Sequence, residues 1–397
     1  MNIPCLKGVL TDPNDILTNA DLKALALELL CLVPMPGIEG SPLAPVDIYE
    51  VVLRAAVAMT SVNGVTSQTS DTPDRKAVMD WLHTLKETPM LDAVTDILAL
   101  LAMTVLDRSR SRTVCLDFMD NPFHGNPEGD EDELRRMPAR DGTTKCHRYC
   151  TAFVIARGKP LTLAVEPITG ADSKADAVER VLDRVEVYPF EIDHILIDRA
   201  AYVGKVIGVL RQTAPPVFPV KTGKASLREK LSTKASYMTE ETICENQEHE
   251  QTFPLAVHLT YQNGDRGKHG VKTTGYAAYG LEDRTPRQVA HLYSKRSAIE
   301  KSYEKFRQAR ALTTTLSRVI RLFYVGVGFL LEQLWVVLLW GVLARPRRGG
   351  RAIPDDFPFR DGFLHGIQQQ LDDELGWRSE YRTNGVGLPS GYGDAIG

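Results

Sequence analysis

A long apolar run near the end of the chain most restricts how it can fold. Residues 322–344 are almost wholly apolar over 23 positions, enough as a helix to cross a bilayer. Such a run must be covered either by lipid or by the rest of the protein. Glu332 and Gln333 lie near its middle, where a charge is costly in lipid, and the run directly continues a charged segment. We therefore expect a buried core helix; the alternative is a membrane-associated protein anchored by residues 322–344.

The charged segment before this run places polar side chains at helical spacing. In YSKRSAIEKSYEKFR, Tyr293, Arg296 and Glu300 are three and four residues apart, and Arg307 follows seven residues later. At 3.6 residues per turn, one helix would present all four on one face. A carboxylate between cations suits chemistry beside phosphates. The same pattern is also typical of a solvated amphipathic helix with charge pairs.

Two upstream strands each carry an aspartate. The run TVCLDFM contains Asp117, and DHILID ends in Asp198. Asp120 is a rival to Asp117, which we prefer because it lies within the apolar strand. Together with Glu300, the two aspartates could hold two Mg²⁺ ions roughly 3.5–4 Å apart, with Mn²⁺ as a substitute. That arrangement is typical of enzymes that cut or join phosphodiesters.

The order of elements predicts an α/β fold. In residues 1–112 apolar side chains recur at helical spacing, and after that point they recur at the spacing of strands. The expected order there is a meander of strands, followed by helix, strand, helix and strand. This order favours a mixed sheet of the ribonuclease-H-like type. The expected divisions are a helical N-terminal domain (1–112), a first core segment (113–221), a β-rich insertion (222–287), a second core segment with the glutamate helix (288–345) and a loosely held C-terminal tail (346–397).

The N-terminal domain has two interpretations. A helix over 46–59, a Ser/Thr-rich turn over 60–72 and a helix over 74–85 are compatible with a helix-turn-helix that binds a DNA end. Arg75 and Lys76 begin the second helix. A plain helical bundle fits the same pattern, because nothing in it fixes contacts to bases.

Composition limits the kinds of partner. With a net charge of −4, a nucleic-acid partner requires a local positive surface. The candidate basic stretches are 221–234, 284–305 and 345–351. Cys146, His147 and Cys150 could begin a zinc site, the alternative being thiols in a reducing cytosol. The first residues do not form a signal peptide pattern, so we expect a cytoplasmic, nucleoid-associated protein without a membrane.

The site residues also carry a family resemblance. The segment from Tyr293 resembles the Y-x₂-R-x₃-E-x₆-K signature of DDE transposases from bacterial and archaeal insertion sequences, with Arg307 where the family has lysine. ILIDRAAY resembles the second-aspartate motif, and VCLDFMDNPFHG the first-aspartate motif of an archaeal branch. That branch also has an apolar run like RVIRLFYVGVGFLLEQLWVVL after the glutamate, but commonly tryptophan where Ser297 stands here.

The resemblance covers about residues 113–345 and implies a function. It implies a ribonuclease-H-like core that cleaves double-stranded DNA at terminal inverted repeats and transfers the strands with Mg²⁺. Carried over by position, Asp117, Asp198 and Glu300 would be catalytic metal ligands. The residues expected to bind DNA phosphates are Tyr293, Arg296, Arg307 and Arg199. Cutting two ends together implies a homodimer on DNA.

The sequence alone leaves other functions open. One is a catalytically inactive DNA-binding protein descended from such an enzyme, against which the three intact carboxylates argue. Another is a different ribonuclease-H-like nuclease, for which the long insertion and the Tyr/Arg helix are less expected.

Overall fold

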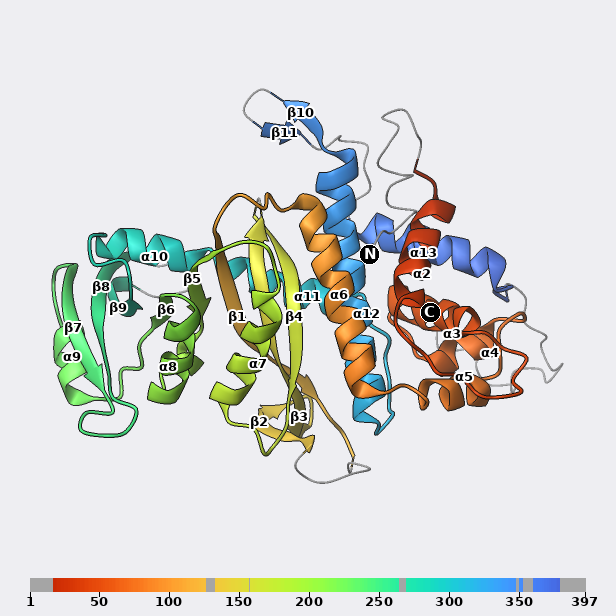
Figure 1. Ribbon diagram of the computed structural model, residues 1–397, viewed down its shortest axis with the longest axis horizontal. Helices are drawn as coiled ribbons and strands as arrows, with labels where there is room; N and C mark the ends of the chain where they lie inside the picture. Colours follow the sequence, from red (N-terminus) through yellow and green to blue (C-terminus); the bar gives the residue numbers. More distant parts are fainter. Residues whose placement is uncertain are drawn as a thin grey trace, which may run out of the picture.

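Three layers make up the portion of the chain that the computed structural model describes, which is residues 17–125, 133–156, 158–263, 269–347, 350–352 and 360–378. A large mixed sheet forms one layer, helices α6 and α12 stand beside it, and the remaining N-terminal helices lie beyond them (Figure 1). The helices of the N-terminal region are α2 (Asn19–Cys31), α3 (Pro45–Val57), α4 (Val62–Gln68), α5 (Arg75–Leu82) and α6 (Glu87–Val105).

The first six strands form the half of the sheet that holds the candidate site. They are β1 (Arg112–Pro122), β2 (Arg135–Arg140), β3 (Thr143–Ala156), β4 (Lys159–Ile168), β5 (Ile192–Ile197) and β6 (Pro216–Pro219). β1 pairs antiparallel with β3, which pairs with both β2 and β4, and on its other side β1 runs parallel to β5, as β5 does to β6. Helices α7 (Lys174–Glu186) and α8 (Gly204–Thr213) connect β4 to β5 and β5 to β6. This topology is consistent with the expected ribonuclease-H-like core.

Residues 222–287 extend the same sheet. This segment contains α9 (Ala225–Leu231), β7 (Tyr237–Ile243), β8 (Gln251–Asn263) and β9 (His269–Ala278). β9 pairs antiparallel with β6, and β8 and β7 follow outward. Two strands were expected here, but β7 was not, because its sequence is acidic. Its Glu241 is 2% exposed and lies 2.8 Å from Nζ of Lys230, so an ion pair accompanies the buried charge.

Helix α12 (Arg318–Val337), continued by the π-helical turn η4 (Leu338–Leu343), is the central helix of the molecule. Within the described residues, Glu87–Val105 and Arg318–Gly341 are long and apolar enough to span a membrane, and the apolar window of the second is wholly buried inside the protein. Its polar groups have partners: Oε2 of Glu332 lies 2.5 Å from Nε of Arg360, and Nε2 of Gln333 donates to the Leu98 carbonyl at 2.6 Å. The expected buried core helix is confirmed.

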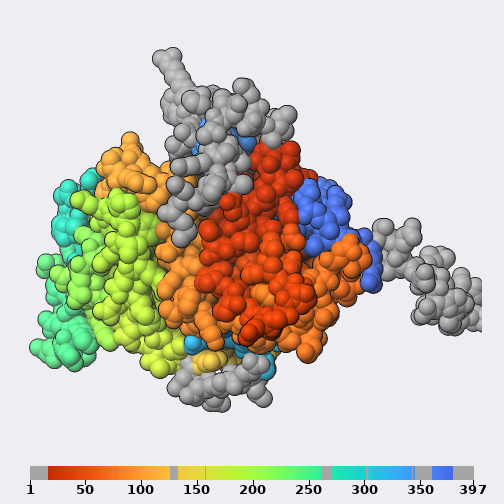
Figure 2. All heavy atoms as spheres, turned by 45° about the vertical axis from the view of Figure 1, so that its right-hand side comes forward, coloured from red at the N-terminus to blue at the C-terminus, as the bar shows by residue number. Residues whose placement is uncertain are grey.

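Some of the C-terminal stretch is firmly packed. Helix α13 (Arg360–Glu374) lies against α2 and α3, and Figure 2 shows it in blue at the edge of the red and orange N-terminal helices. Its apolar stripe, at spacings of four, is fully buried at Phe363, Ile367 and Leu371. The expectation of a loosely held tail is therefore wrong over this helix. A short hairpin, β10 (Arg345–Arg347) and β11 (Gly350–Ala352), precedes it, and residues 379–397 lie outside the described residues.

The N-terminal helices differ from the predicted helix–turn–helix. The polar stretch expected to be a turn contains α4, which begins where the Ser61 hydroxyl accepts the backbone N–H of Gly64 at 3.0 Å. Asp74 then caps α5 by accepting the N–H groups of Lys76 and Ala77. Three helices therefore stand where two were predicted, because serine and aspartate supply the capping acceptors that a polar stretch needs to start a helix.

Candidate active site

Asp117 and Asp198 are neighbours across two parallel strands. Asp117 lies in the middle of β1, and Asp198 directly follows the last residue of β5. Leu116 is the register partner of Ile197, so the next residue on each chain segment is one of the two aspartates. Neighbouring strands are about 4.8 Å apart, which brings the two carboxyl groups close together. Asp198 also begins the 3₁₀ helix η2 (Arg199–Ala201), where its Oδ1 accepts the N–H of Ala200 at 2.7 Å. The sheet thus positions two of the three predicted ligands.

Asp117 is buried and paired with an arginine. It is 8% exposed, and its Oδ1 accepts Nη2 of Arg296 at 2.5 Å and the N–H of Phe118 at 3.0 Å. Burial raises the pKa of Asp117 to about 6; Arg296 opposes this rise, and the charge of Asp198 adds to it.

The helix expected over residues 293–307 is broken. It forms α10 (Pro286–Ser294) and α11 (Ser297–Arg307), with Lys295 and Arg296 between them. At the break, the Arg296 N–H bonds to Tyr293 O at 3.0 Å, and the Ile299 N–H to Arg296 O at 2.9 Å, which is the tighter 3₁₀ pattern. The tighter turn changes the phase of the side chains, so the expectation of one continuous polar face is wrong. Arg296 points inward, whereas the Glu300 side chain is 73% exposed.

Arg296 therefore stands between two predicted ligands. Its Nη2 contacts Asp117, and its Nη1 lies 4.0 Å from Oε1 of Glu300. Within the described residues, no three His, Cys, Asp or Glu side chains form a cluster able to hold a metal. The oxygen donors of Asp117 and Asp198 fit a hard divalent cation, while Glu300 reaches only the arginine beside them.

The remaining predicted residues lie around this pair. The Tyr293 ring packs against Tyr276 with centroids 5.3 Å apart, and burial raises the pKa of Tyr293 to about 12. Arg199 is exposed directly after Asp198. Arg307 lies at the far end of α11, on the wall of a cavity. Their contacts with DNA stay predictions.

Two alternatives weighed on the sequence are less favoured by the geometry. Asp120, the rival first ligand, is held by Arg148 of β3 through bonds of 2.5 and 2.9 Å. Cys146 and Cys150 lie on a single strand, and the Sγ of Cys146 contacts the Arg135 carbonyl oxygen at 3.5 Å. A zinc site at these cysteines gains no support from the described residues.

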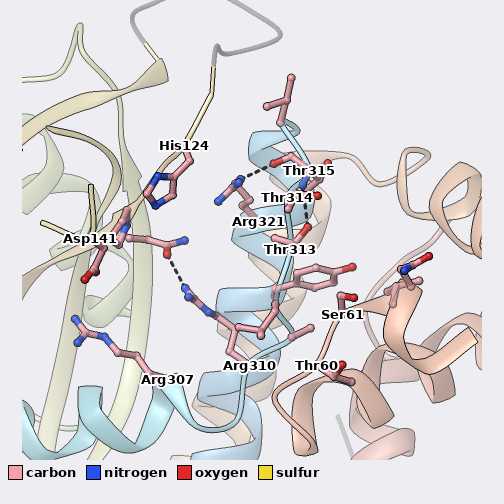
Figure 3. A pocket seen from close by; sticks show the side chains of 18 of the residues that line it. Thr60, Ser61, His124, Asp141, Arg307, Arg310, Thr313, Thr314, Thr315 and Arg321 are labelled. Carbon is pink, nitrogen blue, oxygen red and sulfur yellow. Dashed lines mark hydrogen bonds between the residues drawn. The ribbon is translucent and has the colours of Figure 1, made fainter. Parts of the chain in front are cut away.

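A cavity of about 1150 Å³ opens beyond Arg307. Its walls come from the end of β1, the turn before β3, the segment between α11 and α12, and helices α4 and α5. Figure 3 shows the side chains of Arg310 and Arg321 pointing into the space between His124 and Asp141 on one side and the Thr313–Thr315 segment on the other, with the Arg307 side chain below Asp141. The N-terminal helices contribute Thr60, Ser61 and Arg75 to the same cavity.

Two of these arginines are held by neutral groups. Nη1 of Arg310 donates to the Asn121 side chain at 2.8 Å. Nε of Arg321 donates to the Thr315 carbonyl at 2.7 Å, and its guanidinium lies 4.7 Å from the centre of the Phe123 ring. Burial lowers the pKa of both guanidinium groups, and for Arg310 the charges of Arg307 and Arg321 add to the effect.

Comparison with solved structures shows a fold shared with a DNA transposase. No protein family and no curated protein matches the sequence. A solved structure described as a piggyBac transposase synaptic complex with hairpin DNA matches with a TM-score of 0.51 and 10% sequence identity, over 94% of this chain and 80% of that chain. The likeness is one of fold. This mixed α/β chain shares the fold of that protein, and membership of the bacterial or archaeal insertion-sequence branch stays a prediction.

Sequence reasoning missed Arg310 and Arg321. Arg310 follows the signature by three residues, and Arg321 interrupts the apolar run RVIRLF one turn into α12. An arginine inside an apolar helix could have indicated a functional residue, because a buried charge needs a partner. The segments that surround Arg321 could not be predicted, because they depend on the tertiary structure.

Proposed function

We propose that this protein is a transposase that cuts DNA at the terminal inverted repeats of a mobile element and joins the 3′ ends to target DNA. The observation that carries the proposal is the pair Asp117 and Asp198, neighbours across the parallel strands β1 and β5, with Arg296 between Asp117 and Glu300. The fold shared with a transposase supports the same conclusion.

The proposed reaction consists of two in-line displacements. A water oxygen attacks the phosphorus at the element's end, the 3′ oxygen leaves and takes up a proton, and a 3′-hydroxyl is freed. That hydroxyl then attacks a target phosphorus and displaces the target's 3′ oxygen. Asp117, Asp198 and Glu300 would hold two Mg²⁺ ions, or Mn²⁺, which would stabilise the charge on the attacking and leaving oxygens.

Arg296 would have two positions in this scheme. Without a divalent cation it neutralises Asp117, as its 2.5 Å contact indicates. Released from Asp117, its planar guanidinium can bind a phosphate in bidentate fashion. Tyr293, Arg199 and Arg307 would contact neighbouring phosphates of the same DNA. We propose that the working form is a homodimer on DNA in the nucleoid, which light scattering with and without end DNA would test.

The test is a nicking assay. The substrate is a duplex that contains the DNA flanking the coding region. Alanine at Asp117, Asp198 or Glu300 should lower Mg²⁺-dependent nicking on the order of 10³-fold and leave DNA binding within about twofold. Asp193→Ala is the matched control, because Asp193 lies at the opposite end of β5, where Thr113 bonds to it at 2.9 Å. Nicking by all three variants at the wild-type rate would reject the assignment.

A second candidate function is a DNA-binding protein without catalysis. Two observations favour it: Arg296 already neutralises Asp117, and the described residues form no cluster of three metal-binding side chains. Wild-type protein that binds the flanking DNA but does not nick it in Mg²⁺ or Mn²⁺ would establish this alternative.

A further inference from the structure

The cavity beside Arg307 has more positive charge than its own acids can balance. The cations on its walls are Arg75, Arg140, Arg307, Arg310 and Arg321. Its two acids already have partners: Asp120 pairs with Arg148, and Asp141 lies 3.4 Å from Arg140. Among the described residues, no carboxylate pairs with Arg310 or Arg321. The cavity therefore has an excess of positive charge around two largely buried guanidinium groups.

Keeping such groups in the protein is costly. Arg321 is only 6% exposed, and its partners are a backbone carbonyl and an aromatic face. A largely buried cation loses hydration that neutral partners replace only in part, and an incoming anion would offset that cost. The lowered pKa values of Arg310 and Arg321 have the same physical cause.

We propose that this cavity binds the backbone phosphates of duplex DNA, with Arg310 and Arg321 as its central contacts. The identification of the anion as DNA rests on the proposed function; the need for an anion does not. Hydroxyl groups on the walls, including those of Thr60, Ser61 and Thr314, are further donors of the kind that bind phosphate oxygens.

The size and position of the cavity favour a strand over a small anion. Its volume of about 1150 Å³ is larger than one phosphate group needs, and it lies between the N-terminal helices and the sheet. Helix α11 connects it to the carboxylates, because Arg307 follows Glu300 by seven residues, or about 10 Å along the axis. That distance equals about three base-pair rises along the axis of a duplex. A strand whose phosphate lies at the aspartates would therefore continue into the cavity.

The proposal also gives the N-terminal helices a role. Arg75 at the start of α5 and Asn63 in α4 face the same space as Arg310. These helices would close over the DNA backbone without reading bases. By contrast, the basic stretch over 221–234 is partly neutralised, since Lys224 and Lys230 both pair with Glu241.

The first test changes the mouth of the cavity and spares its buried groups. Thr314 is exposed there, so Thr314→Glu should fold normally and repel phosphate. Binding of a 30-base-pair duplex containing the flanking DNA is measured by fluorescence anisotropy in EDTA, where no cleavage occurs. We expect Thr314→Glu to weaken binding about tenfold and Thr314→Lys to match or exceed wild type. Ser109→Glu, exposed before the opposite end of β1, is the control and should bind like wild type.

The second test uses the salt dependence of DNA binding to estimate the number of phosphate contacts. Arg310→Gln should reduce the slope of log Kd against log salt by about 1, the value for one lost phosphate contact. Arg318→Gln is the matched control, because Arg318 belongs to the same region but pairs with Glu87 at 2.7 Å. It should leave the slope unchanged.

Each outcome has a separate meaning. Equal Kd and salt slope for Thr314→Glu and Ser109→Glu would overturn the cavity proposal, even if wild-type protein nicks end DNA. Thermal stabilisation by inorganic phosphate together with unchanged DNA binding in Thr314→Glu would also overturn it, in favour of a small-anion site. Loss of binding in Thr314→Glu with no nicking by wild type would keep the cavity and reject the proposed reaction.

Discussion

The carboxylate pair and the arginine cavity lie at opposite ends of α11 and differ in whether their charges are neutralised within the protein. At the first, Arg296 neutralises Asp117 within the protein and stands 4.0 Å from Glu300. At the second, Arg310 and Arg321 have only neutral partners within the described residues. One region is balanced before any ligand arrives, whereas the other is left with excess charge.

The difference indicates an order of events. A cation that enters the carboxylate site must displace Arg296, which costs free energy, whereas an anion entering the arginine cavity relieves an existing cost. DNA should therefore bind without a divalent metal, and metal should bind best when a nearby phosphate can accept the released Arg296. The two ends of α11 would then be occupied in sequence.

The largest expected effect is a loss of nicking activity, without a loss of stability, when Glu300 is replaced. Glu300→Gln should lower Mg²⁺-dependent nicking on the order of 10³-fold. Its side chain is 73% exposed and its ion pair is long, so the free energy of unfolding should change by less than about 0.5 kcal/mol. Nicking rates and urea unfolding of the same variant provide the two measurements. A stable variant with wild-type nicking would remove Glu300 from the site.

The next effect contrasts the two buried arginines directly. Arg296→Gln leaves the buried Asp117 carboxylate unpaired and should cost about 3–5 kcal/mol of stability at pH 8. Arg310→Gln removes a charge that has no carboxylate partner among the described residues, and should change stability by about 1 kcal/mol or less. Urea unfolding of both variants in EDTA measures the difference. Equal losses would mean that the two regions do not differ in charge balance.

The smallest effect is a dependence on pH. The pKa of Asp117 is raised to about 6 in the folded chain, above the ordinary value of 3.8. Between these values the folded state binds more protons than the unfolded state, so stability falls as pH rises through this range and is constant above it. Relative to Asp117→Asn, wild type should lose about 2.4 kcal/mol between pH 4 and pH 7 in EDTA. Parallel curves for the two proteins would show that Asp117 has an ordinary pKa.

Patterns local in sequence allowed much of the fold to be predicted. The run TVCLDFM predicted β1 and DHILID predicted β5, and the helix expected after the meander is α7, which Ser173 caps. The buried α12 followed from its length together with Glu332. Asp117 and Asp198 were expected to share one metal site, and the parallel register of β1 and β5 makes them neighbours.

Features decided by tertiary contacts could not be predicted. No Pro or Gly marks the helix break at Lys295 and Arg296 in the sequence. The break turns the Arg296 side chain toward Asp117, 179 residues away along the chain. The partners of Arg310 and the surroundings of Arg321 depend on segments from α4, β1 and α12 meeting at one cavity. The packing of α13 likewise depends on α2 and α3, which are distant in the sequence.

The central claim is that Asp117, Asp198 and Glu300 hold divalent metal together when DNA is bound. The most direct test replaces Mg²⁺ with Fe²⁺ on the DNA-bound protein and adds ascorbate and peroxide, so that radicals formed at the metal cut the polypeptide nearby. The account predicts cuts near residues 117, 198 and 300, all suppressed by excess Mg²⁺ and absent from Asp198→Ala. Cuts confined to other segments, or near the two aspartates without residue 300, would contradict it.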